Sequence, residues 1–323
     1  MEEQSTQKDR YLRWIFIILA LSLILNIVFL ASKFNNSEDA HRSDLKYIDP
    51  SRENLIDRNV QDASTILHYQ GLKEQIEGEI KQYGNEEDVG VFIQDVQTGS
   101  WLGINERKGF VPASLLKIPI MMATLKNVER GTLTLQTKIQ IEQEDIDQSY
   151  QSGIERRAGE EVTVTQLLED MISYSDNTAK NALKRQVTPE ELDSIFKHVG
   201  ITNPYRAPID NQTVTSRGYT RLFKALYYST YLPPEFSQLG LEFATDTSYE
   251  NMLPAGIPPG VQVAHKFGIY GENPSKALHD CGIVYHEKSP YFICIMTQNI
   301  EIEQAADLIR TLSQTTYEFV NEE

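Results

Sequence analysis

The chain has 323 residues, of which 40% are hydrophobic, so it can bury one large core or two small ones. Its formal net charge is −16, and no basic stripe interleaved with aromatic residues interrupts the acidic balance. The composition excludes an intrinsically disordered chain, and the charge argues against a nucleic-acid partner.

The first predicted element is an apolar run at residues 14–31, WIFIILALSLILNIVFLA, which carries no charged residue. As a helix it is long enough to cross the hydrocarbon core of a bilayer. Tyr11 and Trp14 stand where an aromatic belt forms. The alternative is a cleaved signal peptide, but no clean small-x-small site follows the run, so an uncleaved anchor is favoured. We expect a short cytoplasmic head at 1–13 and a single-pass protein in the cell membrane.

Residues 32–62 are polar and lack sustained periodicity, which predicts a tether between the anchor and a catalytic domain at 63–323. The domain is predicted to begin with an amphipathic helix at 66–83. Two strand-like runs follow at 88–104, joined by a turn at Thr98 and Gly99.

The middle of the domain is predicted to be helical. Thr163 and Gln166 form a capping box, and Thr188 and Glu191 form another, which ends at the helix stop Gly200. Strands are predicted again at 261–268 and 281–296, and a last amphipathic helix at 305–320. This order indicates a sheet domain that carries a helical one.

The segment FVPASLLKIPIM, residues 110–121, places Ser114 and Lys117 one helical turn apart, so both side chains project from one face. A serine becomes a good nucleophile when a base takes its proton. A lysine can be that base when burial or nearby positive charge favours its neutral form. At a helix start, the N–H of Ser114 would also be available to an oxyanion. Pro119 implies either a kink after this turn or a regular helix that begins later.

Two further motifs give the Ser-Lys pair a meaning that it lacks alone. A Ser-Asp-Asn triple stands at 175–177, and a Lys-Phe-Gly triple at 266–268 lies on the predicted late strand. Each alone is typical of a cap, a turn or a strand end. In this order, Ser-x-x-Lys, Ser-Asp-Asn and Lys-x-Gly are the motif set of class A β-lactamases and penicillin-binding proteins. Over about residues 63–320, the chain resembles the penicillin-recognising serine enzymes, in their class A β-lactamase-like branch.

The resemblance implies a fold and a set of catalytic roles. The fold is α+β, an α/β sandwich in which an antiparallel sheet is flanked by N- and C-terminal helices, with an all-helical domain inserted at about 120–220. It implies that Ser114 is the nucleophile that forms an acyl-enzyme and that Lys117 is its proton acceptor or relay. It also implies that Ser175 passes a proton to the leaving nitrogen.

The resemblance further implies a substrate-binding edge. Lys266 would supply positive charge near the substrate carboxylate, and the N–H groups of Ser114 and Ile269 would form an oxyanion hole. Asn177 would hydrogen-bond the side-chain amide of the substrate. The residues expected to contact substrate are Asn177, Phe267, Gly268 and Ile269.

The chain departs from the family pattern at two places. Phe267 stands where the family usually carries a threonine or serine hydroxyl that helps to bind the substrate carboxylate. In the loop ITNPYRAPIDNQT, residues 201–213, the glutamate that activates the deacylating water is missing. Asp210 is the only carboxylate there, and it is either a substitute base or a turn residue before Asn211.

The remaining polar residues suggest no cofactor. Cys281 and Cys294 are equidistant from a predicted turn at Glu287 and Lys288, so they would oppose one another. Two buried thiols are favoured over a disulfide. His265 is interpreted as a strand residue near the site, and no Cys/His cluster has metal-ligand spacing.

Three functional hypotheses follow from the sequence. The favoured one is a membrane-anchored, monomeric, class A β-lactamase-like serine hydrolase that acts on β-lactams with slow deacylation. The second is a D,D-carboxypeptidase or transpeptidase acting on peptidoglycan stem peptides. The third is a non-enzymatic module that binds the cell wall. Wall substrates would place the catalytic domain outside the cytoplasm.

Overall fold

The computed structural model describes residues 46–48, 63–84, 86–208, 211–271 and 276–322. The predicted anchor at 14–31 lies outside these ranges, and so does the predicted tether at 32–62 apart from residues 46–48. Among the residues described, no helix is both long and apolar enough to span a bilayer.

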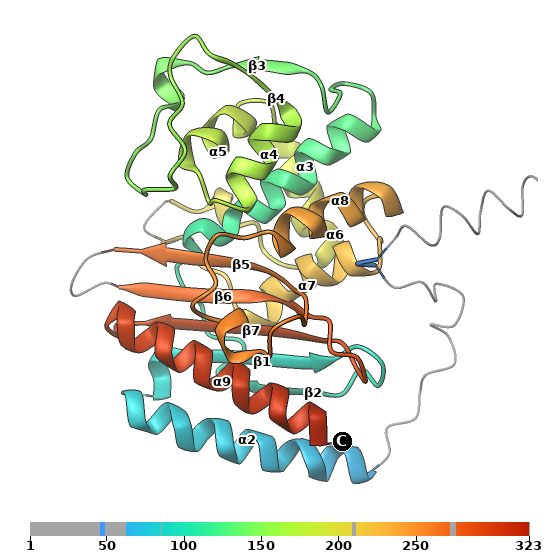
Figure 1. Ribbon diagram of the computed structural model, residues 1–323, viewed down its shortest axis with the longest axis vertical. Coiled ribbons are helices and arrows are strands. Elements are labelled where there is room, and N and C mark those ends of the chain that lie inside the picture. The colour runs from blue at the N-terminus through green and yellow to red at the C-terminus, as the bar shows by residue number, and fades with distance from the viewer. Residues whose placement is uncertain (1–45, 49–62, 85, 209–210, 272–275, 323) are drawn as a thin grey trace, which may run out of the picture. The chain divides into compact units, whose positions relative to one another are not determined.

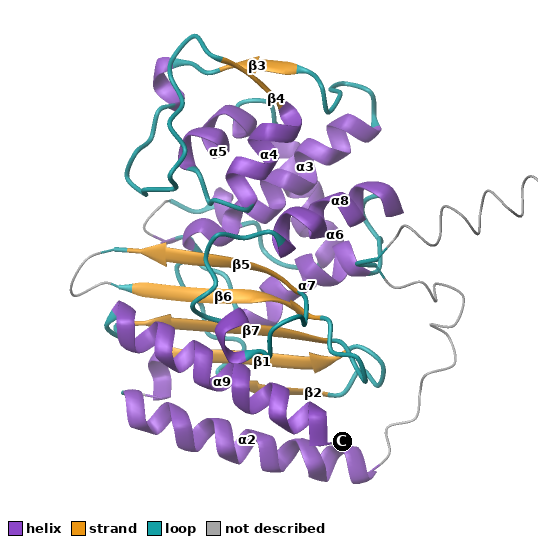
Figure 2. Cartoon of the chain, in the orientation of Figure 1, coloured by secondary structure: helices purple, strands orange, loops and turns teal. Residues whose placement is uncertain are grey.

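A five-stranded antiparallel sheet, in the order β2-β1-β7-β6-β5, carries the domain (Figure 1). Its first two strands form the predicted hairpin, and Gly99 in their turn has a φ of 73°. All residues of β6 are buried, because both faces of the sheet are covered. β5 is the edge strand at the opposite side of the sheet from β2, and it runs beside the helical part (Figure 2). The strands are β1 (Val89–Asp95), β2 (Trp101–Ile104), β5 (Val263–Tyr270), β6 (Ala277–Val284) and β7 (Tyr291–Gln298).

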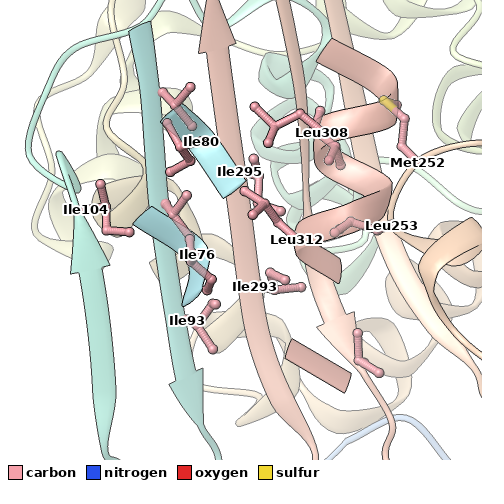
Figure 3. Packing of buried hydrophobic residues seen from close by; sticks show 14 of the residues in the cluster. Ile76, Ile80, Ile93, Ile104, Met252, Leu253, Ile293, Ile295, Leu308 and Leu312 are labelled. Atoms are coloured by element: carbon pink, nitrogen blue, oxygen red, sulfur yellow. The ribbon is translucent and has the colours of Figure 1, made fainter. Parts of the chain in front are cut away.

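The two terminal helices, α2 (Ala63–Tyr83) and α9 (Ile302–Glu322), pack side by side over one face of the sheet (Figure 1). Their apolar residues recur at helical spacing and fill the main core with isoleucines of the strands (Figure 3). The antiparallel sheet and its flanking terminal helices therefore confirm the predicted α+β fold. Core residues labelled in Figure 3 include Ile76, Ile80, Ile293, Ile295, Leu308 and Leu312.

The helical part lies between β2 and β5 in the sequence. It continues to Thr245, past the expected limit at about 220, and it contains a small two-stranded sheet that the sequence pattern did not predict. α7 packs on the face of the main sheet opposite α9. The elements are α3 (Lys117–Glu129), β3 (Lys138–Gln140), β4 (Glu161–Thr163), α4 (Val164–Ile172), α5 (Asn177–Lys184), α6 (Pro189–Val199), α7 (Ser216–Tyr227) and α8 (Pro234–Thr245).

Both predicted capping boxes are present. The Thr163 side chain accepts the N–H of Gln166, and the Thr188 side chain accepts the N–H of Glu191. Gly200 ends α6 in the left-handed region with a φ of 68°, which glycine adopts without strain. These helix ends are set by local chemistry, which is why short sequence motifs located them.

The two cysteines correct one expectation from the sequence. Cys281 and Cys294 are direct cross-strand partners on β6 and β7, as their spacing predicted. They form a disulfide, so the preference for two free thiols was wrong. Because the two residues are directly opposite one another on neighbouring strands, their sulfur atoms come within bonding distance. Both cysteines are fully buried, and the disulfide forms inside the core.

Candidate active site

Ser114 lies on a short 3-10 helix, η3 (Ala113–Leu116), and α3 begins at Lys117. The regular helix therefore begins after Ser114, which places Pro119 in its first turn, where a missing N–H costs nothing. Ala113, immediately before Ser114, has a φ of 49°, a conformation that non-glycine residues rarely adopt. Strain of this kind persists when the surroundings hold the segment in place.

One anchor of this turn comes from β6. His279 is fully buried, and its Nδ1 accepts the N–H of Thr297 at 3.2 Å. Nε2 must therefore carry the ring proton, which it donates to the carbonyl oxygen of Val111 at 2.7 Å. Burial lowers the pKa of His279 to about 4, so the ring stays neutral and keeps both hydrogen bonds at neutral pH.

Two tyrosine hydroxyls hold the other end of the turn. Tyr219 of α7 donates to the carbonyl oxygen of Leu115 at 2.9 Å, and Tyr205 donates to that of Leu116 at 3.0 Å. Burial raises the pKa of both tyrosines, which keeps their hydroxyls protonated as donors. We call His279, Tyr205 and Tyr219 the carbonyl anchors. They hold the backbone on both sides of Ser114.

Lys117 is almost completely buried beneath this turn, with 1% of its surface exposed. Its Nζ donates to the carbonyl oxygen of Ser175 and, at 3.0 Å, to the Ser175 hydroxyl. Burial, together with the positive charges of Lys266 and Lys180, holds the pKa of Lys117 well below its usual value. The two hydrogen bonds use both N–H groups of a neutral amine and leave its lone pair to accept a proton.

The Ser-Asp-Asn triple joins α4 to α5. Ser175 has a φ of 56°, which turns the chain sharply and directs its hydroxyl to Lys117. Asp176 caps α5 by accepting the N–H of Ala179 at 2.7 Å. Asn177 is half-buried and donates from its side-chain amide to the Ser149 hydroxyl at 3.1 Å. Ser175 and Lys117 are thus brought together, and Asn177 follows two residues after Ser175.

Lys266 is buried on β5, and its Nζ has no hydrogen-bond partner among the residues described. The amine lies 3.9 Å from the centre of the Phe267 ring. Burial lowers the pKa of Lys266 to about 7, although the negative charge of Asp280 opposes the change. A carboxylate brought to Lys266 would supply the missing partner for its charged form.

The rest of the Lys-Phe-Gly motif lies on β5, and Gly268 borders the turn that contains Ser114. A Cβ at Gly268 would come within 3.2 Å of the Pro112 carbonyl oxygen and 3.3 Å of the Ala113 Cβ, so glycine here avoids a tight contact between β5 and the turn. Phe267 is buried against Tyr249, with ring centres 4.3 Å apart and planes nearly parallel. Ile269 follows on the same edge strand and is half-buried.

Asp210 and His265 are two further residues singled out in the sequence. Asp210 is outside the described residues. His265 pairs through its Nδ1 with fully buried Asp280 of β6 at 2.8 Å, which agrees with its interpretation as a strand residue. Among the residues that the structure describes, no group of three or more His, Cys, Asp or Glu is placed to hold a metal ion.

Sequence reasoning missed the carbonyl anchors and Tyr249. Tyr205 lies in the loop already singled out for its missing glutamate, so that loop could have been searched for a second role. His279 and Tyr219 lie 168 and 104 positions from their partners, and no local pattern marks such distant pairs.

Comparison with known proteins finds a family model, curated relatives and solved structures that are similar to this chain. A family model described as the beta-lactamase enzyme family matches residues 71–320. The extended-spectrum β-lactamase PER-1 of Pseudomonas aeruginosa is 26% identical over 269 residues, covering 77% of this chain and 87% of that protein. A β-lactamase of Bacillus licheniformis is 26% identical over 193 residues, covering 56% and 62% of the two chains.

Solved structures share the fold. PBP-A matches with a TM-score of 0.69 at 24% identity, covering 78% of this chain and 97% of that one. A structure of a PBP-A mutant is described as an acyl-enzyme complex with penicillin G. The TLA-3 extended-spectrum β-lactamase matches with a TM-score of 0.70 at 18% identity, covering 78% and 98% of the two chains.

Proposed function

Since the chain belongs to the beta-lactamase enzyme family, we propose that it opens β-lactams by forming an acyl-enzyme at Ser114. The observation that carries the proposal is the buried amine of Lys117, which is held by Ser175 one helical turn from Ser114 and whose pKa is lowered by burial and by Lys266. This environment favours the neutral form of an amine one helical turn from Ser114, and a neutral base that can take the serine proton is the requirement for serine nucleophilic catalysis.

The acylation step follows from the proposed roles. Lys117 takes the proton of Ser114 as its oxygen attacks the lactam carbonyl carbon, and the N–H groups of Ser114 and Ile269 receive the oxyanion. The carbon–nitrogen bond then breaks, and Ser175 gives its proton to the leaving nitrogen. Lys117, now protonated, returns a proton to Ser175 through their hydrogen bond, which completes the balance.

Release of the acyl group is proposed to be slow. Hydrolysis of the ester needs a water activated by a general base, and residues 201–213 contain no glutamate for that role. Loss of general-base help slows a step by about 10²–10⁴-fold. A β-lactam should therefore produce a burst of about one equivalent, followed by slow turnover. If Asp210 is a partial substitute, Asp210→Asn should prolong the acyl-enzyme without changing acylation.

An intact-mass time course with a penicillin tests acylation and release separately. The protein should gain the mass of one penicillin. Ser114→Ala should prevent the gain, and Lys117→Ala should slow it by about 10²–10⁴-fold. Ser100→Ala, in the β1–β2 turn, is the matched control and should label normally. Normal labelling of the Ser114→Ala protein would remove the nucleophile assignment.

A second function, D,D-carboxypeptidase or transpeptidase activity on stem peptides, is favoured by one observation. The nucleophile, its base and Ser175 are all retained, whereas the glutamate specific to β-lactam release is missing from 201–213. Release of D-alanine from a peptide ending in D-Ala-D-Ala, lost in Ser114→Ala, would identify this activity. Absence of both acylation and D-alanine release would leave the third hypothesis, a non-enzymatic wall-binding module.

We also propose that residues 14–31 anchor the protein in the cell membrane with the catalytic domain outside the cytoplasm. The support is the length of the apolar run and the wall location of the substrates. The full chain should remain in the membrane after carbonate extraction, and external protease should digest its domain in cells stripped of wall. Protection from external protease would reverse the orientation.

A further inference from the structure

The N-terminal end of α7 borders a pocket whose described lining contains no acidic side chain. The pocket has a volume of about 510 Å³, within the range of small-molecule sites. Arg107, Arg217 and Arg221 line it, together with three threonines. In a chain with 46 acidic and 30 basic residues, three arginines around one pocket are a local reversal of charge.

Arg217 is one of the three arginines that line the pocket, and its contacts show how its guanidinium is held. Its Nη1 is shielded from solvent and has no hydrogen-bond partner among the described residues. The carboxylate of Glu106 lies 3.8 Å from that atom, beyond hydrogen-bond distance. The guanidinium stacks on Trp101, 4.4 Å from the ring centre. Stacking holds the donor group rigidly while one of its nitrogens remains unsatisfied.

Arg221 is also held in place. Its Nη1 donates to the carbonyl oxygens of Val199 and Gly200, at 3.2 and 2.8 Å, where α6 ends. One turn further along α7, burial lowers the pKa of Lys224, and the positive charges of Arg221 and Arg217 lower it further. The positive charges on this side of α7 therefore repel one another, and an anion would relieve that repulsion.

The backbone of α7 does not provide the recognition. The N–H of Gly218 is taken by the Thr215 hydroxyl at 2.9 Å, and the N–H of Arg217 by the carbonyl oxygen of Glu106 at 3.2 Å. Recognition must come from the arginine side chains, whose planar, forked N–H groups match the oxygens of phosphate.

We propose that this arginine pocket binds a phosphate group, either free phosphate or the headgroup of an anionic phospholipid. Glu106 offsets one of the three positive charges, so the pocket retains an excess that suits a doubly charged oxyanion. The site is separate from the proposed acyl-transfer residues, and its occupation does not depend on that chemistry.

Tryptophan fluorescence provides the test, because the Arg217 guanidinium stacks on the Trp101 ring. The chain has two tryptophans, so Trp14→Phe in the full-length protein, in nonionic detergent, leaves Trp101 as the only reporter. Inorganic phosphate should change its fluorescence saturably, and potassium chloride at equal ionic strength should not. Dihexanoyl phosphatidylglycerol and the zwitterionic dihexanoyl phosphatidylcholine then distinguish the sources: only the first competes if the site accepts a lipid phosphate.

Substitutions in the same background decide the assignment. Arg217→Gln and the exposed Arg221→Gln should each weaken phosphate binding about tenfold or more, since each removes charged hydrogen bonds. Arg310→Gln on α9, on the opposite face of the sheet, is the control and should bind normally. A response that is absent, equal with chloride, or unchanged in the Arg221→Gln protein would overturn the proposal, even if Arg217→Gln fails to fold.

Discussion

The folded protein should lose stability in mild acid through the protonation of one residue, His279. In the folded state its ring must be neutral, because Nδ1 accepts the Thr297 N–H while Nε2 donates to Val111. Burial lowers its pKa to about 4, against 6.5 for an exposed histidine. Between these two values the unfolded chain binds more protons than the folded one, so stability falls as the pH falls.

The size of the effect follows from that difference. At about 1.4 kcal/mol for each pH unit, folded and unfolded pKa values of about 4 and 6.5 correspond to about 3 kcal/mol. The contribution of His279 is complete above pH 6.5 and is lost progressively between pH 6.5 and 4. Because typical domains are stable by about 5–15 kcal/mol, this loss is a large share of the total.

His279→Gln isolates this term, because the glutamine side chain offers an NH₂ donor group and an oxygen acceptor and does not titrate. Urea unfolding from pH 4 to 7 should show a free energy of unfolding that falls about 3 kcal/mol less in the variant than in the wild type. His279→Ala should be destabilised at every pH, by about 1–3 kcal/mol for each of the two backbone groups left unpaired. Parallel pH curves for wild type and His279→Gln would refute the reasoning.

Two further predictions concern β5. Acylation by a β-lactam that carries a carboxylate should decline above a pH of about 7, because deprotonation of Lys266 removes the charge that would attract that carboxylate. Stopped-flow acylation rates should show this, and Lys266→Gln should remove the alkaline decline; a decline that persists in the variant would reassign it. Phe267→Thr restores the hydroxyl of the family motif and should speed acylation by about tenfold or more, at a stability cost of about 3 kcal/mol from the lost stacking on Tyr249. Phe267→Ala is its control, and an equal rate in both variants would exclude the hydroxyl as the cause.

Features decided by neighbours in the sequence could be predicted. The caps at Thr163 and Thr188 form because a side chain reaches an N–H three residues away. The opposition of Cys281 and Cys294 follows from equal distances to one turn, although the bond between them did not. The sequence spacing was enough to predict that the two cysteines are neighbours, whereas the disulfide between them was seen only in the structure.

Features decided by distant segments could not be predicted. The Ser114–Lys117 pair was recognisable, but the backbone strain at Ala113 depends on groups that hold the turn from elsewhere in the fold. The bond of Tyr219 to this turn joins residues 104 positions apart. The edge position of β5, which brings Gly268 against the turn, depends on the order of all five strands.

The carbonyl anchors affect how freely the side chains of residues 111–116, the segment around Ser114, can change during evolution. All three donate hydrogen bonds to main-chain carbonyl oxygens, at Val111, Leu115 and Leu116, and every amino acid supplies such an oxygen. The half-buried side chains at Val111 and Leu116 can therefore drift and reshape the rim of the site while Ser114 stays in place. The structural constraint therefore falls on His279, Tyr205 and Tyr219, and substitutions at positions 111 and 116 can change the rim while the backbone around Ser114 stays in place.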